Sequence, residues 1–129
     1  MKALSLTQPW ATAIIIGMKQ YETRSWSTSR RERIYIHAAK GFPRYAKEFA
    51  QREMALKRIP EQLPFGFLIG TAVIDSVLST TVVTGNITPV ERLYGDYSYG
   101  RFAWKLTDVQ ALVEPIPYKG SLGLFEVSL

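Results

Sequence analysis

The order in which strand and helix patterns follow one another constrains the fold of this chain most. Its two longest strand patterns are residues 67–80, FLIGTAVIDSVLST, and residues 101–114, RFAWKLTDVQALVE, both rich in β-branched and aromatic side chains. Shorter strand patterns cover residues 2–6, 33–39 and 122–129. Because helices do not alternate with these strands one by one, the pattern is not that of a regular parallel sheet. We expect an α+β fold, a small and mostly antiparallel β-barrel of about six strands flanked by two or three helices.

The first predicted helix follows the first strand. Thr7 can cap it, its first turn tolerates Pro9, and Gly17 is a natural end. Residues 10–16 leave almost no polar face, so we expect this helix to be buried on most sides. Residues 18–26 are predicted to leave it as an extended strand.

Two further helices are predicted. One begins at Pro43 and continues to about Arg58, with apolar side chains at helical spacing and charged pairs on the wet side. The other is short, with Thr88 as its cap and Pro89 at its first position. The spacing that supports the longer helix comprises the apolar residues Phe42, Tyr45, Phe49 and Leu56 and the pairs Glu48–Arg52 and Glu53–Lys57.

Length and composition are those of one folded domain, residues 1–129. Apolar residues make up 47% and charged residues 21% of the chain, well away from disordered sequences. The chain has no cysteine and one histidine, His37, so we expect no disulfide, no metal site and no cofactor. The N-terminus lacks the pattern of a signal peptide, and no apolar run reaches the ~18 residues of a membrane span. We therefore expect a cytoplasmic protein that has no membrane partner.

Basic residues are concentrated in one third of the sequence. Residues 19–58 contain eleven Lys and Arg against four acids, whereas the rest of the chain has five bases against seven acids. This asymmetry suits a polyanionic partner, because contacts to phosphates release counterions and supply most sequence-independent affinity for nucleic acid. A solvated basic helix would give the same count, so the charge alone leaves both interpretations open.

Lys19, Glu22 and Arg24 lie close together directly after the apolar helix. In a strand Glu22 and Arg24 share one face, so their head groups can pair or converge on one ligand; Lys19 faces the other way unless a bulge turns it. Exposed charges that pair only with each other would explain the same pattern. Threonine and serine hydroxyls abound nearby, but their spacing marks out none of them.

Trp10 and Trp26 flank this charged segment. Aromatic faces beside cations are what base recognition needs, since stacking adds ~1 to 3 kcal/mol per base. We expect Trp10, on an almost wholly apolar helix, to pack in the core. Trp26 precedes the basic loop 27–33 and fits either role.

Two other polar residues belong to predicted strands. His37 shares a strand face with Tyr35 and is a candidate for proton transfer, although we favour a hydrogen-bonded structural histidine. Asp75 ends an apolar alternation and is either a turn-former or a functional carboxylate. The chain contains no nucleotide-binding glycine loop, no calcium loop and no Gly-x-Ser-x-Gly elbow.

The segment LSLTQPWATAIIIGMKQYETRSW, residues 4–26, closely resembles the ASCH domain. In that family a strand, a Gln-Pro-Trp-Ala corner and a helix lead into a Gly-x-Lys-x-x-Glu-x-Arg motif, which here is Gly17, Lys19, Glu22 and Arg24. The likeness continues through IYIHA, GTAVID, YGRFAWKL and KGSLGLFEV, and so spans essentially the whole chain.

The resemblance implies a PUA-like β-barrel with helices around a cleft that is used for RNA and lined by the Lys, Glu and Arg of the motif. Some small bacterial relatives are amidohydrolases that remove the acetyl group from N4-acetylcytidine with Lys, Thr and Glu, and Lys19 has the position of their lysine. Glu22 stands where those enzymes have the nucleophilic Thr, and Thr23 is adjacent. Other relatives have been linked to RNA cleavage.

Three functions follow as hypotheses. In the first, which we favour, the chain binds RNA or a nucleotide: Arg24 and Lys19 hold a phosphate or a base carbonyl, Glu22 orients Arg24 or accepts a base amino proton, and Trp26 stacks on a base. In the second, the chain is a hydrolase of a modified nucleoside or of an RNA phosphodiester, with Lys19 as base or nucleophile. In the third, it is a protein-interaction module in RNA-handling complexes.

The candidate residues form two sets. The catalytic candidates are Lys19, Glu22, Thr23 and Asp75. The residues expected to bind single-stranded RNA or a nucleotide, including a loop and a helix that would follow the backbone, are Lys19, Glu22, Arg24, Trp26, Arg30, Arg31, Arg33, His37, Arg44 and Lys47.

Overall fold

The computed structural model describes all residues 1–129. The elements, in chain order, are β1 (Lys2–Leu6), α1 (Trp10–Ile15), β2 (Tyr21–Arg24), β3 (Arg33–Ala38), α2 (Arg44–Ala55), β4 (Phe67–Ser79), α3 (Thr80–Val83), α4 (Pro89–Leu93), β5 (Phe102–Pro117) and β6 (Leu124–Glu126). All six strands form one sheet in the order β2-β5-β4-β3-β1-β6. Only β1 and β3 pair in parallel; the other pairs are antiparallel. The predicted α+β, mostly antiparallel fold is confirmed.

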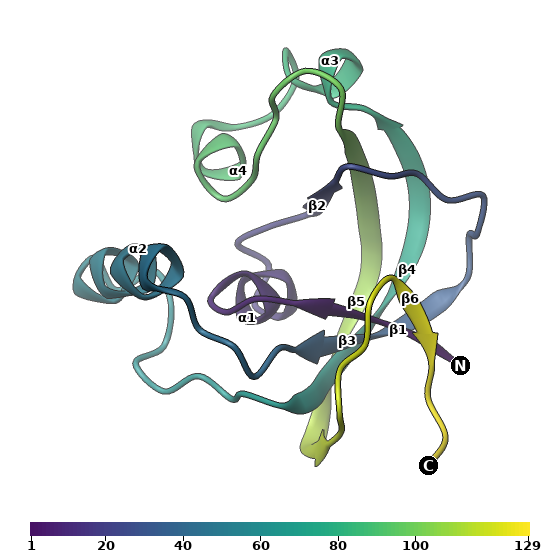
Figure 1. Cartoon of the computed structure of the whole chain (residues 1–129). Coiled ribbons are helices and arrows are strands. Elements are labelled where there is room, and N and C mark those ends of the chain that lie inside the picture. Colours follow the sequence, from purple (N-terminus) through teal and green to yellow (C-terminus); the bar gives the residue numbers. More distant parts are fainter.

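The sheet curls around α1 into a half-open barrel, with α2 and α4 on the open side (Figure 1). The curl has a local cause in the two longest strands, β4 and β5. Their pairing shifts register three times, between Leu68 and Gly70, Thr71 and Val73, and Ile74 and Ser76. Each irregularity of this kind bends the strands and increases their twist.

Gly70 lets α1 approach the sheet closely. A Cβ at this position would lie 2.4 Å from Ile15 Cδ1 and 2.7 Å from the carbonyl oxygen of Gln110. No other residue type fits between the helix and the neighbouring strand without a shift of one of them. A glycine inside a strand is typical of such a close approach or of a bulge, and Gly70 also lies at one of the register shifts.

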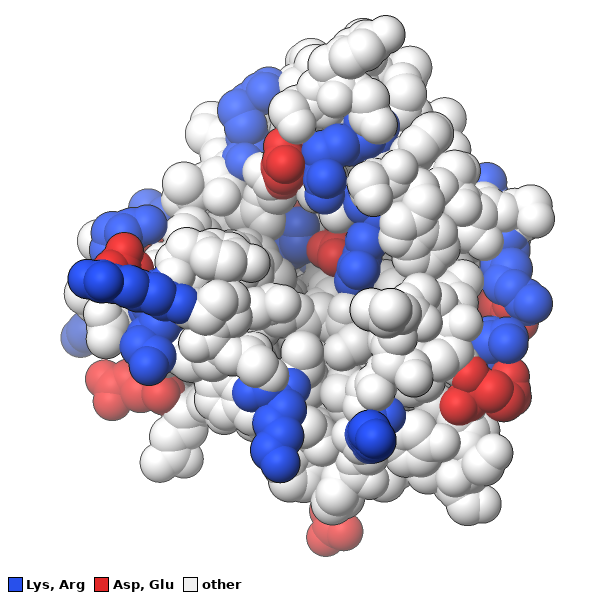
Figure 2. Space-filling view, viewed as in Figure 1, with Lys and Arg blue, Asp and Glu red and all other residues white.

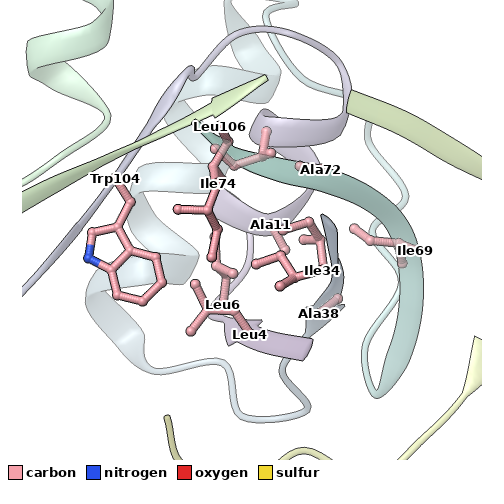
Figure 3. Close-up of a cluster of buried hydrophobic side chains, with 12 residues drawn as sticks. Leu4, Leu6, Ala11, Ile34, Ala38, Ile69, Ala72, Ile74, Trp104 and Leu106 are labelled. Carbon is pink, nitrogen blue, oxygen red and sulfur yellow. The ribbon is translucent and has the colours of Figure 1, made fainter. Parts of the chain in front are cut away.

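The main core fills the space between the concave face of the sheet and α1 (Figure 3). Strands contribute alternate side chains to it, as their period of two requires. Its twelve buried residues are Leu4, Leu6, Ala11, Ile14, Ile34, Ile36, Ala38, Ile69, Ala72, Ile74, Trp104 and Leu106. A smaller cluster joins α1 to α2 and α4 and consists of Ala13, Phe49, Ala50, Ile59 and Tyr94. As predicted, α1 is buried on most sides.

The start of α1 differs from the prediction. The cap position is Pro9, and no side chain caps the helix there, so the expected cap by Thr7 is wrong. The buried side chain of Gln8 satisfies part of the first turn instead, because its Oε1 accepts the N–H of Thr12 at 2.9 Å. The short helix α4 begins as predicted, with the Thr88 hydroxyl accepting the N–H of Glu91 at 3.1 Å.

The charged residues of α2 pair differently from the prediction. Glu48 pairs with Arg44 at 3.0 Å, and the buried Glu53 pairs with Arg58 at 3.2 Å. Glu53 turns inward because the hydroxyl of Tyr94 donates to it at 2.6 Å. The expected pairs of Glu48 with Arg52 and of Glu53 with Lys57 are therefore wrong. The expected apolar face is also wrong at Tyr45 and Leu56, which are exposed.

None of the four helices combines the length and the hydropathy that a helical membrane span needs.

The helix α3 was not predicted. It has only four residues and follows β4 directly.

Candidate functional site

A cleft of about 560 Å³ lies on the open side of the curled sheet, and we name it the central cleft. In Figure 2 the middle of this face is hollowed, with both basic and acidic atoms inside the hollow and further basic atoms around it. Five parts of the chain contribute the lining residues, which are Ser5, Leu6, Thr7 and Trp10 at the β1–α1 corner, Lys19 and residues 22–26 around β2, Tyr45 of α2, residues 93–96 after α4, and Arg101.

The three charged residues of the Lys-Glu-Arg motif meet in the central cleft. Lys19 Nζ lies 3.7 Å from Glu22 Oε1, and Arg24 Nε lies 3.0 Å from Glu22 Oε2. Lys19 reaches this side because β2 begins only at Tyr21, so strand alternation does not apply to it. The sequence alone allowed Lys19 to face either way, and the irregular chain before β2 places it on the same side as Glu22 and Arg24. The Arg24–Glu22 contact is an ion pair whose N–H is not aligned as a hydrogen bond.

Lys19 forms the floor of the central cleft. Its side chain is buried, and Nζ donates to the carbonyl oxygen of Tyr94 at 2.9 Å. Gly95 leaves room for it, because a Cβ there would lie 3.4 Å from Nζ and 2.8 Å from the Tyr97 ring. Burial lowers the pKa of Lys19 below its ordinary value, although the carboxylates of Glu22 and Glu91 oppose this shift.

Glu91 fixes the segment that carries Lys19. Its carboxylate is buried; Oε1 accepts the N–H of Gln20 at 2.8 Å, and Oε2 accepts the N–H of Tyr21 at 3.3 Å. These bonds hold the chain at the start of β2, directly after Lys19. Nothing in the local sequence marks this residue, because its partners lie 70 and 71 positions away in the chain.

Two arginines are held by backbone carbonyls on the wall of the central cleft. Arg24 Nη2 donates to the carbonyl of Ser5 at 2.7 Å. Arg101 Nη2 donates to the carbonyl of Thr23 at 3.1 Å, and its Nε donates to that of Asp96 at 3.2 Å. The Nη1 group of each arginine donates to no protein atom. Each guanidinium is thus oriented and still has hydrogen-bond donors to offer a ligand.

Aromatic side chains form the other walls. Trp26 packs edge-on against Trp104, with ring centroids 4.8 Å apart. Trp10 stacks on Phe49 at 5.4 Å and lies 6.0 Å from the exposed ring of Tyr45. Trp10 packs against the smaller core cluster, as expected, but it is only half-buried and also lines the cleft.

The remaining catalytic candidates differ in position. Thr23 lines the central cleft, but it is buried and its hydroxyl accepts the N–H of Asp96 at 3.1 Å. Asp75 lies outside the cleft and is exposed, at the register shift between Ile74 and Ser76. The structure therefore groups Thr23 with the charged motif and does not group Asp75 with it.

None of the loop and helix cations of the sequence prediction lines the central cleft. Each has a local contact: Arg30 pairs with Glu32 at 2.6 Å, Arg31 donates to the Thr28 carbonyl at 2.8 Å, Arg33 pairs with Asp108, Arg44 pairs with Glu48, and Lys47 lies 5.9 Å from the Phe42 ring centre. Tyr45, which stands between Arg44 and Lys47 in α2, does line the cleft.

His37 is buried and hydrogen-bonded on both ring nitrogens. Nε2 lies 2.7 Å from the carbonyl oxygen of Tyr118, and Nδ1 lies 2.8 Å from the Ser5 hydroxyl. A carbonyl oxygen only accepts, so Nε2 carries a proton and donates it to Tyr118, and Nδ1 forms the second hydrogen bond with the Ser5 hydroxyl. This is the geometry of a structural histidine. No group of three or more His, Cys, Asp or Glu side chains gathers where it could hold a metal ion.

Comparison with known families gives a clear match, since the model of the ASCH domain covers residues 4–117. The chain belongs to the ASCH domain family. Activating signal cointegrator 1 from human is 28% identical over 124 residues, and the mouse protein of the same name is 27% identical. Each alignment covers 92% of this chain but 21% of the relative. The chain therefore spans about a fifth of the length of these curated relatives.

Solved structures of ASCH proteins share the fold. The crystal structure of ASCH from Zymomonas mobilis matches with a TM-score of 0.61 at 18% identity, covering 98% of this chain and 87% of that chain. A single-residue variant of the same protein matches with a TM-score of 0.61 at 19% identity, covering 98% and 89%. The family has a PUA-like fold and is suggested to bind RNA. The ASCH resemblance and the PUA-like architecture predicted from the sequence are confirmed.

One wall of the cleft in this ASCH domain was missed by the sequence analysis. Tyr94, Gly95, Asp96 and Arg101 come from the tract 91–101, which was interpreted only as a short helix and the start of a strand. The available signal was the composition of this tract, because glycines, tyrosines and charged residues between two strands are typical of a functional loop.

The lowered pKa of Lys19 predicts how stability depends on pH in this ASCH domain. Between the lowered pKa and the ordinary value of 10.5, the unfolded chain binds the lysine proton and the folded chain does not. The free energy of unfolding therefore gains a contribution as the pH rises through this window, and loses it as the pH falls through the lowered pKa. Because the ordinary pKa of tyrosine is close to this window, the contribution of Lys19 is taken as the difference in the free energy of unfolding between wild type and Lys19→Met. We expect this difference to rise with pH, as measured by urea unfolding. A constant or falling difference would contradict the assignment.

Proposed function

We propose that this ASCH domain binds single-stranded RNA or a nucleotide in the central cleft. The observation that carries the proposal is the pair Arg24 and Arg101, each held by backbone carbonyls and each with a free Nη1 group. A guanidinium that is already oriented loses little rotamer entropy when it binds, and its fork matches a phosphate or a base carbonyl. Family membership supports the same ligand class.

The other groups of the cleft suit a nucleotide as well. Glu22 offers carboxylate oxygens to a base amino group, and its ion pairs with Lys19 and Arg24 fix its position. Trp10 and Trp26 offer aromatic faces for stacking. Lys19 adds positive charge at the floor of the cleft, where its ammonium donates to the Tyr94 carbonyl. The cleft volume of about 560 Å³ lies within the usual ~300 to 1,000 Å³ of ligand sites.

Replacing Arg24 by Gln tests the proposal. We expect the affinity for a labelled single-stranded RNA of mixed sequence, measured by fluorescence anisotropy at low salt, to fall roughly 10- to 100-fold, because charge-assisted hydrogen bonds contribute ~1.5 to 3 kcal/mol. Arg31→Gln is the matched control, with the same charge change on a residue outside the cleft. Urea unfolding establishes that both variants remain folded. Equal losses in the two variants would place RNA on the basic loop and contradict the proposal.

A second candidate function rests on the burial of Lys19. A lysine whose pKa is lowered has a larger neutral fraction, which a base or nucleophile needs. Thr23 and Glu22 lie in the same cleft, and the activity would be hydrolysis of a modified nucleoside such as N4-acetylcytidine or of an RNA phosphodiester. Mass spectrometry of an acetylcytidine-containing RNA after incubation separates the two functions. Deacetylation or cutting that is lost in Lys19→Met favours the hydrolase, and unchanged RNA favours binding alone.

A further inference from the structure

A second groove adjoins the central cleft, and we name it the side groove. It has a volume of about 880 Å³ and is lined by residues 39–40, 65–67 and 117–122 together with Ser5 and His37. It lies between the end of β3 and the loop that joins β5 to β6. The central-cleft proposal does not use any of these residues except Ser5.

Ser5 connects the two sites. It lines both of them, and both of its polar groups are fixed: its carbonyl accepts from Arg24 at 2.7 Å, and its hydroxyl is hydrogen-bonded to His37 at 2.8 Å. His37 is in turn anchored to the Tyr118 carbonyl at 2.7 Å. The central cleft and the side groove thus meet at Ser5, whose carbonyl and hydroxyl are both held by hydrogen bonds.

The side groove carries positive charge without a balancing acid. Lys40 and Lys119 line it, no Asp or Glu does, and neither lysine forms an ion pair or a hydrogen bond. The carbon stem of Lys40 passes Gly66, 3.9 Å from where a Cβ would be. Figure 2 shows basic atoms below the hollow as well as around it. An unpaired pair of ammonium groups beside a site proposed for RNA suits the phosphates that continue along its backbone.

The loop after β5 adds neutral donors. The backbone N–H groups of residues 119–122 donate to no protein acceptor. Gly120 holds this loop against His37, because a Cβ there would lie 2.9 Å from the ring carbon Cε1 and 3.2 Å from Ser5 Oγ. Free N–H groups on a loop that is held in place are a common means of contacting phosphate oxygens.

Aromatic rings supply the remaining surface. Phe65, Phe67 and Tyr118 line the side groove, and each is half-buried. Phe65 is supported by Phe42 at a centroid distance of 4.9 Å, and Tyr118 by Phe125 at 6.4 Å. Rings that are supported from behind and open on one side provide stacking platforms for unpaired bases.

We propose that the side groove binds the nucleotide next to the one in the central cleft, so that a single strand of RNA crosses Ser5 and occupies both. Lys40, Lys119 and the loop N–H groups contact its phosphate, and the aromatic rings stack on its base. This inference rests on the proposed function of the central cleft, and it adds that the ligand is an oligonucleotide and not a free mononucleotide.

Calorimetry with ligands of two lengths tests it. The probes are the four 5′-mononucleotides and the four homopolymeric tetranucleotides of RNA. We expect the best tetranucleotide to bind at least about 10-fold more tightly than its mononucleotide, since each stacked base contributes ~1 to 3 kcal/mol. The double variant Lys40→Gln/Lys119→Gln loses the phosphate contact but keeps the rings, so it should reduce this gain and leave the mononucleotide affinity unchanged. The slope of log K against log salt concentration should become shallower by about 0.7, the value for one lost phosphate contact on a single strand.

Each of the single variants Lys40→Gln and Lys119→Gln has Lys57→Gln as its matched control, because Lys57 is exposed and lines neither site. Equal affinities for the two lengths, or equal effects of the single variants and Lys57→Gln, would overturn the side groove and leave the central cleft intact. Failure of wild-type protein to bind either length would overturn the proposed function and this inference together. A polyglutamate peptide that binds through Lys40 and Lys119 in place of the tetranucleotide would make the side groove a protein site and overturn the inference.

Crosslinking locates the second nucleotide independently of affinity. A tetranucleotide with one photoreactive 4-thiouridine, placed in turn at each position, is irradiated with the wild-type protein and the adducts are mapped by mass spectrometry. We expect adducts on Phe65, Phe67 or Tyr118 from the position next to the one that labels Trp10 or Trp26. Adducts confined to central-cleft residues would contradict the inference.

Discussion

Trp104→Ala should lower the free energy of unfolding by about 3 to 5 kcal/mol, the usual cost of truncating a large buried aromatic side chain. Trp104 belongs to β5, between β2 and β4 in the sheet, and is fully buried in the main core. Its ring packs edge-on against Trp26, and its Nε1 donates to the Trp26 carbonyl at 3.3 Å. The variant loses both the core volume and the support of a cleft wall. Urea unfolding gives the stability, and the same samples give the RNA affinity.

Two variants show that this loss comes from burial. Tyr99→Ala removes an aromatic ring that is 92% exposed, and we expect a change within about 0.5 kcal/mol. Trp104→Phe keeps a ring in the core but loses the N–H donor, so it should fall between Tyr99→Ala and Trp104→Ala. If Trp104→Ala and Tyr99→Ala had similar stabilities, the placement of Trp104 in the core would be wrong.

Glu91→Ala should be the second most damaging change, with a loss of about 2 to 4 kcal/mol, because hydrogen bonds to charged groups contribute ~1.5 to 3 kcal/mol. The variant leaves the N–H groups of Gln20 and Tyr21 without their acceptor. It also removes one of the two carboxylates that oppose the lowering of the Lys19 pKa. We therefore expect the Lys19 pKa to fall further, and RNA binding to weaken as the start of β2 loosens.

The matched control is Glu61→Ala, which removes an exposed carboxylate that forms no ion pair. Glu91→Gln keeps one acceptor oxygen and should have an intermediate stability. Urea unfolding gives the stabilities, and carbon-detected NMR titration of the lysine side chains gives the pKa of Lys19. Equal stabilities of Glu91→Ala and Glu61→Ala would show that Glu91 does not hold the start of β2.

Local features of the fold could be predicted because their causes are local. The start of α4 depends on Thr88 and Pro89, which lie side by side in the chain, and the structure has the predicted cap. The long strands β4 and β5 follow from runs of β-branched and aromatic residues. The close approach at Gly70 could be predicted, because a glycine weakens a strand and its presence inside one often marks such an approach.

Residues with distant partners could not be predicted in the same way. Glu53 belongs by spacing to the wet side of α2, yet it is buried because the Tyr94 hydroxyl, 41 positions away, donates to it. Trp10 belongs by composition to a buried helix, yet one side of it lines the central cleft. Helical periodicity says which side chains share a face, but it does not say which neighbour that face meets.

The sequence by itself determined the class of fold, the family and the charged motif of Lys19, Glu22 and Arg24, because apolar periodicity and motif spacing are properties of neighbouring residues. Only the tertiary structure decided which groups complete the cleft. It buries Lys19 against the Tyr94 carbonyl, places Arg101 in the same cleft as Arg24, and leaves Asp75 outside. The physical reason is that buried donors and acceptors must find partners wherever the fold places them, and Lys19, Gln20 and Arg101 each have a partner 71 to 78 residues away.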